Sequence, residues 1–249
     1  NLRISYEASE KYMDYLNYHT DESNRFTSSH DGPWVEEYRK FEETHTNPDR
    51  LVASLFKDKY FILKKVNPKE LMWGMYWVAS DMQNAETKVS FYDLFKGQEL
   101  FDLWQCVNYR FYVGNANHAD GKGIVVANAK SLLRNILDSA DEAIRKGGIA
   151  ATLRFGHDGN VIPLVALMQI ENCNVAVSDP YEVYKVWSDF KVVPMAANVQ
   201  IIFFRNEKSN DILVKIMHNE NEVHIPVQTD MFPYYRWRDV ENYYRGMLK

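Results

Sequence analysis

The sequence predicts an α/β protein, and neighbouring features of its second half carry that prediction. Residues from Val125 to Arg145 place apolar side chains along one stripe at helical spacing, and a Gly-Gly pair ends the stripe. Directly after that pair, Ile149 to Phe155 is rich in β-branched and apolar residues, which is typical of a strand. The polar turn Gly156 to Asn160 follows, and the apolar stretch Val161 to Ile170 then predicts a second helix. Helix, strand, turn and helix in this order are typical of an α/β core.

The C-terminal part predicts an antiparallel hairpin or meander followed by a helix. Val199 to Phe204 and Ile212 to His218 are strand-like, and a polar turn separates them. Glu222 to Val227 is a candidate for a third short strand. Trp237 to Leu248 predicts a closing helix.

The residues before the Gly-Gly pair predict mostly helices. Helical patterns run from Ala8 to Tyr18, from Trp34 to Glu43 and from Lys69 to Met82. Two Asn-Pro pairs, at residues 47–48 and 67–68, mark breaks between elements. This half therefore supplies helices and no predicted strand.

Composition excludes several classes of protein. The 249 residues, 46% of them apolar, suffice for one large domain or two small ones with a substantial core. The net charge of -5 and the pI near 5.8 provide no basic field for a phosphate backbone, so nucleic acid is not an expected partner. The richest apolar stretch is short and contains Pro163, so we expect no transmembrane segment.

The two cysteines, Cys106 and Cys173, exclude a disulfide-dense scaffold and a CxxC metal site. A single disulfide and two buried thiols both remain compatible with the sequence. The chain begins with Asn1 rather than Met and shows no signal peptide, so we expect that sequence upstream has been removed.

The turn at residues 156–160 is the candidate site, and it contains His157 and Asp158. Ligand sites of α/β proteins gather where strands end, beside helix N-termini whose N–H groups favour anions. A structural interpretation is also open: Asp158 or Asn160 caps the following helix, and His157 is an ordinary turn residue.

The residues around that pair carry a resemblance. Arg154 to Asn160, opening an apolar helix, resembles the HD motif of the histidine acid phosphatases, the group with phytases and multiple inositol polyphosphate phosphatases. Asn198 to Arg205 and Val214 to Val227 resemble the closing strand pair of that family, and Asn1 to Phe95 resembles its helical cap. The resemblance is clearest from Leu100 onward.

The resemblance implies a histidine-phosphatase-like α/β core that is incomplete here, a mostly helical cap and a C-terminal antiparallel strand pair. It places the cap at residues 1–122 and the C-terminal part of the core at residues 123–249. In this family a histidine of an Arg-His-Gly-x-Arg-x-Pro motif attacks phosphorus, and arginines hold the phosphoryl oxygens. By resemblance, Asp158 donates a proton to the leaving alcohol and His157 contacts the phosphate, with no metal or other cofactor.

One departure from the family pattern is large. None of the seven histidines lies in an Arg-His-Gly sequence, so the nucleophile and its flanking arginines are absent from these residues. We expect that the N-terminal segment of the core is missing from this chain; an inactive relative is the alternative. The missing segment would then be a partner of this chain.

Other motifs indicate weaker sites. Gly121-Lys122-Gly123 has the spacing of neither a phosphate loop nor a dinucleotide fingerprint and predicts a loop. His30-Asp31 lies in a polar turn with no strand before it and is expected to be solvated. No histidine spacing suits zinc. Four side chains are further candidates for facing a substrate from the cap: Asn108, Arg110, Tyr112 and Asn115.

Two functions follow as hypotheses. The first is a metal-independent phosphomonoesterase that forms a phosphohistidine and prefers an inositol polyphosphate such as phytate. The second is a non-catalytic module that binds a phosphorylated ligand at His157. By family resemblance the expected location is periplasmic or secreted.

Overall fold

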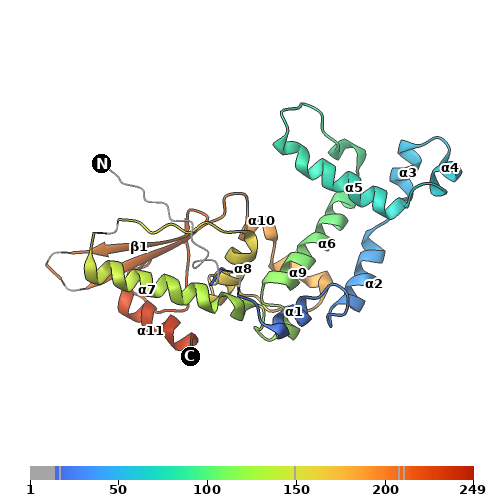
Figure 1. Ribbon diagram of the computed structural model, residues 1–249. Coiled ribbons are helices and arrows are strands. Elements are labelled where there is room, and N and C mark those ends of the chain that lie inside the picture. The colour runs from blue at the N-terminus through green and yellow to red at the C-terminus, as the bar shows by residue number, and fades with distance from the viewer. Residues whose placement is uncertain (1–14, 17, 149, 207, 210) are drawn as a thin grey trace. The chain divides into compact units, whose positions relative to one another are not determined.

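The computed structural model describes residues 15–16, 18–148, 150–206, 208–209 and 211–249, and this part of the chain folds into two compact units (Figure 1). Unit 1 comprises the described residues up to Gly32, together with Phe111–Ser178 and Lys185–Lys249. Unit 2 comprises Pro33–Arg110 and Asp179–Tyr184. These units divide the chain differently from the ranges 1–122 and 123–249, whose assignment to cap and core stays a prediction.

Unit 2 is helical. Its elements are α2 (Val35–His45), α3 (Asp49–Leu55), α4 (Lys59–Leu63), α5 (Pro68–Asp81), the 3₁₀ turns η2 (Met82–Asn84) and η3 (Tyr92–Leu94), and most of α6 (Gly97–Asn115) and α9 (Pro180–Val186). The predicted helices at 34–43 and 69–82 are confirmed as α2 and α5. Most of the helix predicted from residue 8 lies outside the described residues. The core of this unit gathers Leu51, Met72, Tyr76, Ala79, Phe95 and Leu103.

A two-pronged ion pair joins α3 to α6 inside unit 2. Arg50 donates from Nε and Nη2 to the two carboxylate oxygens of Glu99, each at 2.5 Å, and also to the carbonyl of Leu94 at 2.7 Å. Burial, the largest single influence, would raise the pKa of Glu99. The hydrogen bonds from Arg50 and from the backbone N–H of Lys96, together with the positive charges of both residues, outweigh burial and hold that pKa below its usual range. Such fork geometry is the strong form of an ion pair.

Unit 1 carries the remaining helices. They are α1 (Asp21–Thr27), the 3₁₀ turns η4 (Ala119–Gly121) and η5 (Val126–Ala129), α7 (Lys130–Lys146), α8 (Asp158–Leu167), α10 (Asp189–Val192) and α11 (Trp237–Met247). The predicted helix at 125–145 is confirmed, although its first turn is the 3₁₀ turn η5. The predicted helix at 161–170 begins three residues earlier, at Asp158, and ends at Leu167.

Unit 1 also holds a four-stranded antiparallel sheet. Strand β2 (Ile212–His218) pairs with β1 (Val199–Arg205) from Val199 opposite His218 to Arg205 opposite Ile212. It also pairs with β3 (Asn221–Glu222) and β4 (Tyr234–Arg236). The predicted hairpin is therefore confirmed, the candidate strand at 222–227 shrinks to β3, and β4 was not predicted.

The strand predicted at residues 149–155 is wrong for the part that is described. Residues 150–157 form no strand, and none of the described residues pairs with their backbone in a ladder. Leu153 is 72% exposed and Phe155 is 81% exposed. Composition favours a strand here, but a strand forms only when a neighbour completes its ladder and covers its side chains.

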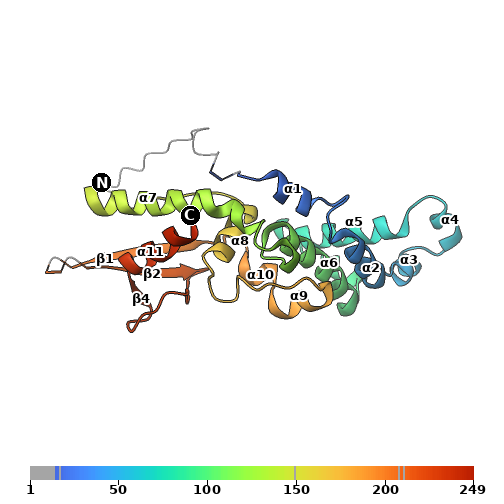
Figure 2. The same cartoon turned by 90° about the horizontal axis from the view of Figure 1, so that it is seen from below.

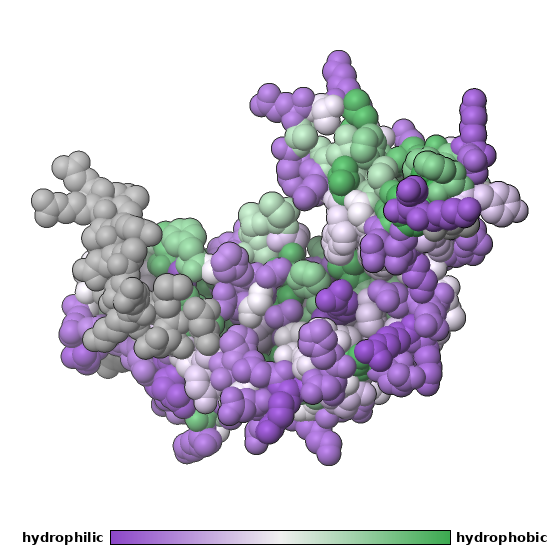
Figure 3. All heavy atoms as spheres, turned by 45° about the vertical axis from the view of Figure 1, so that its right-hand side comes forward, coloured by the Kyte–Doolittle hydropathy of each residue, from purple (hydrophilic) through white to green (hydrophobic). Residues whose placement is uncertain are grey.

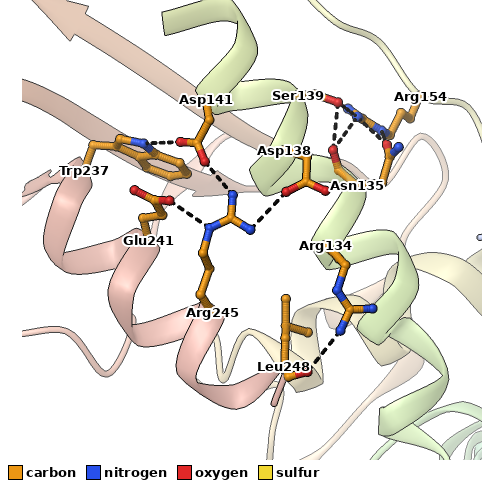
Figure 4. A network of polar contacts seen from close by, with 10 residues as sticks. All are labelled: Arg134, Asn135, Asp138, Ser139, Asp141, Arg154, Trp237, Glu241, Arg245 and Leu248. Atoms are coloured by element: carbon orange, nitrogen blue, oxygen red, sulfur yellow. Dashed lines mark hydrogen bonds and ion pairs between the residues drawn. The ribbon is translucent and has the colours of Figure 1, made fainter. Parts of the chain in front are cut away.

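Helices α7 and α11 pack together and lie alongside the sheet in both ribbon views (Figures 1 and 2). Figure 4 shows the polar contacts that join them. Arg245 on α11 donates to Asp138 at 2.9 Å, to Asp141 at 2.5 Å and to Glu241 at 2.7 Å. The indole of Trp237 donates to Asp141 at 3.1 Å. We call this group of five side chains the α7–α11 clasp.

Both cysteines are free and buried, which decides between the two states that the sequence left open. Cys106 lies in unit 2 and Cys173 in unit 1. Burial raises the pKa of each thiol to about 12.

Apolar side chains also reach the surface of unit 2, where Figure 3 shows hydrophobic residues among hydrophilic ones. Tyr60, Phe61 and Trp77 are about half exposed or more. Among the described residues, no helix is long and apolar enough to cross a membrane.

Candidate functional site

The turn at residues 156–160, here called the HD turn, leads directly into α8. His157 is the N-cap residue, with the extended backbone of φ -116° and ψ 172°, and Asp158 is the first helical residue. Both side chains are exposed. The structure thus places both predicted site residues at a helix N-terminus, where the helix dipole favours an anion.

Asn160 closes the HD turn from within. Its Oδ1 accepts a hydrogen bond from the backbone N–H of His157 at 2.9 Å. Its Nδ2 donates to the backbone carbonyl of Leu16 at 2.8 Å. The carboxamide therefore satisfies one of the N–H groups that a helix start leaves without an intrahelical acceptor.

Gly156 is required by the position of that carboxamide. A Cβ atom on Gly156 would lie 2.8 Å from Oδ1 and 3.3 Å from Cγ of Asn160. Because two hydrogen bonds hold the Asn160 side chain, it does not yield easily to such a contact. The absence of a side chain at 156 lets the backbone pass directly over the amide.

Asp158 uses one carboxylate oxygen locally. Its Oδ1 accepts from the N–H of Gly159 at 2.8 Å. Within the described part of the chain, no Lys, Arg or His forms an ion pair with it. Of the two residues proposed as helix caps, Asn160 accepts from the N–H of the N-cap residue, whereas the N-cap position itself belongs to His157 and not to Asp158.

Arg154, the cation closest in sequence to the HD turn, is bound to α7. Its guanidinium donates to Oδ1 of Asn135 at 2.6 and 3.1 Å and to Oγ of Ser139 at 2.7 Å (Figure 4). These bonds tether the extended segment before the turn. Arg154 therefore fixes the backbone that leads to His157 rather than supplying an available cation.

Residues 1–219 match the family model of the histidine phosphatase superfamily, branch 2. The chain belongs to this superfamily. No curated protein matches it. The recognition of the family from the residues around His157, and with it the histidine-phosphatase-like fold, is confirmed.

Solved structures of a multiple inositol polyphosphate phosphatase from Bifidobacterium longum resemble this chain in fold. The complex with inositol hexasulfate has a TM-score of 0.61 at 22% identity and covers 70% of this chain. The phosphate complex has a TM-score of 0.59 at 22% identity and also covers 70% of it, and the apo form has 0.58 at 23% and covers 68%. The chain spans 38% of the first and third of those proteins and 39% of the second.

A small pocket lies beside the HD turn, within unit 1. Its cavity of about 20 Å³ has room for roughly one water molecule. The lining includes Gly159 and Asn160 of the turn, together with His19, Asn115 and Asn128. Asn128 is buried and donates to Ser23 and His19, while its Oδ1 has no partner among the described residues.

The four further candidates for substrate contact have different surroundings in the structure. Asn115 lines the small pocket, whereas Asn108 and Tyr112 are buried and Arg110 is exposed. The Tyr112 hydroxyl donates to the carbonyls of Asn117 and Val175 and accepts from the N–H of Val177. Burial raises its pKa to about 12. Tyr112 is thus a core residue of α6, a helix that was not predicted from the sequence.

Of the two weaker motifs, His30-Asp31 lies in a turn, and Gly121-Lys122-Gly123 begins at the end of η4 and continues into a turn. Lys122, after η4, adopts a left-handed backbone conformation, and His30 is exposed in a turn where Ser28 donates to Asp31. Among the described residues, no group of three or more His, Cys, Asp or Glu side chains is placed to hold a metal ion.

Proposed function

We propose that this chain supplies the proton-donor half of a phosphomonoesterase that works through a phosphohistidine. One observation carries the proposal: in a chain of the histidine phosphatase superfamily, Asp158 is the first residue of α8 and its carboxyl group is exposed beside His157. A phosphate that approaches this helix end meets a favourable dipole and the imidazole of His157 together.

The chemistry divides between the two side chains. An alkoxide is a poor leaving group, so protonation of the bridging oxygen by the Asp158 carboxylic acid lowers the barrier. His157 contacts the phosphoryl oxygens, and a hydrogen bond from its imidazole stabilises the charge on them. After the alcohol leaves, the Asp158 carboxylate is placed to take a proton from the water that attacks the phosphohistidine.

The nucleophile belongs outside these 249 residues in this proposal, because they contain no Arg-His-Gly sequence. The segment that carries the nucleophilic histidine and its arginines is then a required partner of the chain. The same observation supports the second candidate, a phosphate-binding module without turnover. An Arg-His-Gly-x-Arg-x-Pro sequence upstream in the intact gene supports the enzyme, and its absence supports the binding module.

We further propose an inositol polyphosphate such as phytate as the substrate, and a periplasmic or secreted location. The fold likeness to a phosphatase of this class supports the substrate, as does the ability of one of those structures to hold inositol hexasulfate. The location rests on family resemblance alone.

The decisive test is Asp158→Asn in the complete enzyme. Loss of the general acid lowers kcat/KM for inositol hexakisphosphate by about 10²- to 10⁴-fold. The loss for p-nitrophenyl phosphate is much smaller, since its phenolate leaves without protonation. Steady-state kinetics on both substrates measure the difference.

The matched control is Asp189→Asn, which changes a carboxylate at the start of α10, outside the HD turn, and should leave both rates nearly unchanged. Circular dichroism of each variant establishes that it is folded. Equal losses on the two substrates, in folded Asp158→Asn, would show that Asp158 is not the acid.

A further inference from the structure

The carboxamide of Asn160 makes two hydrogen bonds of opposite sense, and together they fix its orientation. Oδ1 accepts from His157 N–H and Nδ2 donates to Leu16 carbonyl oxygen, at 2.9 and 2.8 Å. Rotating the amide by half a turn would set an N–H against an N–H and an oxygen against an oxygen. The side chain therefore has one orientation in which both groups are satisfied.

That orientation constrains the acid between the two bonded residues. The bond from His157 N–H to Asn160 closes a ring through the backbone of residues 157–160, and Asp158 lies inside this ring. The backbone N–H groups of Asn160 and Val161 donate to the carbonyl of His157 at 2.9 and 3.2 Å, which closes the same turn again. The direction in which Asp158 leaves the backbone is set by this ring, because few other contacts hold its exposed side chain.

The bond to Leu16 ties the ring to a segment far away in sequence. Leu16 is 144 positions from Asn160, and the neighbouring carbonyl of Tyr15 accepts from Ser131 Oγ of α7 at 2.9 Å. Two adjacent backbone carbonyls are thus anchored, one to α7 and one to the HD turn. Both acceptors are backbone carbonyl oxygens, which every residue type provides. This anchor therefore does not depend on the side chains at positions 15 and 16.

We propose that Asn160 is a positioning residue for the proton donor: its carboxamide sets the geometry of the HD turn and thereby the place of the Asp158 carboxyl at the leaving-group oxygen. Gly156 belongs to the same device, because only a residue without Cβ leaves room for the amide. This inference rests on the proposed function of Asp158. In this proposal Asn160 acts through Asp158 and not on the substrate directly.

The test uses the complete enzyme and two variants that disturb the carboxamide differently. Asn160→Ala removes it, whereas Gly156→Ala keeps it but places a Cβ against its oxygen. Misplacement of a catalytic group by about 1 Å costs on the order of 10²-fold, so we expect losses of about 10- to 100-fold in kcat/KM for inositol hexakisphosphate. For p-nitrophenyl phosphate the expected loss stays within about threefold, because that leaving group hardly needs the acid.

Two further variants serve as a control and as a partial rescue. Asn67→Ala removes an asparagine that binds the N–H groups of Lys69 and Glu70 at the start of α5, so it matches the loss of a helix-end contact in unit 2. It should change neither rate by more than about twofold, as expected of a cap that affects stability alone. Asn160→Gln retains donor and acceptor one methylene further out and should recover part of the loss.

Each outcome decides one claim. Equal losses on both substrates for Asn160→Ala and Gly156→Ala, with a selective loss for Asp158→Asn measured in parallel, overturn the positioning role and leave the proposed function intact. Equal losses for Asp158→Asn overturn the proposed function itself. Should Asn160→Ala fail to fold, Gly156→Ala and Asn160→Gln carry the same comparison.

Discussion

The HD turn and the α7–α11 clasp lie in the same unit, yet their charged side chains are used in opposite ways. In the clasp, one guanidinium binds three carboxylates, and Trp237 adds a further hydrogen bond. In the HD turn, two ionisable side chains are exposed, and a single neutral amide holds the backbone beneath them. In the clasp, which stabilises the fold, the charged side chains bind one another. In the HD turn, the ionisable side chains remain accessible to a ligand, and their positions are set by hydrogen bonds of the backbone.

The apolar residues of the two regions differ in the same way. Leu133 of α7 is fully buried, whereas Phe155, just before the HD turn, is 81% exposed. Buried area is what stabilises an apolar side chain, so these two residues contribute very differently to the free energy of unfolding.

Truncating those two residues gives the largest expected difference in stability. Leu133→Ala should lower the free energy of unfolding by about 2–5 kcal/mol, since it leaves a cavity in a packed core. Phe155→Ala should change it by no more than about 0.5 kcal/mol, as an exposed position does. Urea unfolding followed by circular dichroism measures both. A comparable loss for Phe155→Ala would mean that the segment before the HD turn is covered.

Removing the cation of the clasp gives an intermediate effect. Hydrogen bonds that Arg245 donates to Glu241 and Asp141 raise the pKa of its guanidinium well above the usual range, so the group stays charged. Arg245→Ala should cost about 1–2 kcal/mol, a figure that allows for solvent screening at a side chain about one third exposed. The loss should shrink in high salt, because salt screens the repulsion among the remaining carboxylates.

Arg238→Ala on the same helix is the matched control. Arg238 is 82% exposed and lies 3.9 Å from Asp239, so its removal should have almost no effect on urea unfolding. If both arginines contributed equally, the clasp would have no special role in holding α11 to α7.

Two buried histidines of unit 1 give the smallest expected effect, which appears as a pH dependence. Burial lowers the pKa of His118 and of His218, and the hydrogen bond from His218 to the carbonyl of Val192 opposes it only partly. Since the unfolded state binds the proton more readily, their contribution is complete above a pH of about 6.5 and is lost as the pH falls through that value. The free energy of unfolding cannot change by more than about 1.4 kcal/mol per pH unit for each histidine.

Urea unfolding at pH 7.5 and 5.5 measures this loss. His118→Gln should reduce the difference between the two values, whereas His30→Gln, in an exposed turn, should not. A wild-type chain with the same free energy of unfolding at pH 7.5 and at pH 5.5 would contradict the lowered pKa of the two buried histidines. The window lies above the pH at which Glu99, with its lowered pKa, begins to titrate.

How far the sequence predicts the structure depends on where each element finds its partners. The stripe at residues 125–145 needs only a face to bury, and the hairpin of β1 and β2 finds its partner a few residues away, so both follow from local patterns. Residues 150–155 have the composition of a strand but need a distant neighbour. Strand β4 has three residues between Pro233 and a helix, which is too short for a pattern.

The site divides in the same manner. The turn residues around His157 and Asp158 predict a helix start at this place, and α8 begins there. The bond from His157 N–H to Asn160 agrees with the interpretation that Asn160 caps this helix. The bond from Asn160 to Leu16 and the attachment of Arg154 to Asn135 were missed, because Leu16 and Asn135 are distant in sequence. The spacing of residues 157 and 160, that of a capping box, is the local signal that points to Asn160.

The buried cysteines give the molecule a property that none of its polar groups supplies. With pKa values raised to about 12, the thiolate fraction of each at neutral pH is on the order of 10⁻⁵, and alkylating reagents react with thiolates. Modification therefore reports the moments at which a thiol is uncovered. Cys106 belongs to unit 2 and Cys173 to unit 1. The alkylation rate of each cysteine therefore measures how often its own unit opens, without any engineered probe.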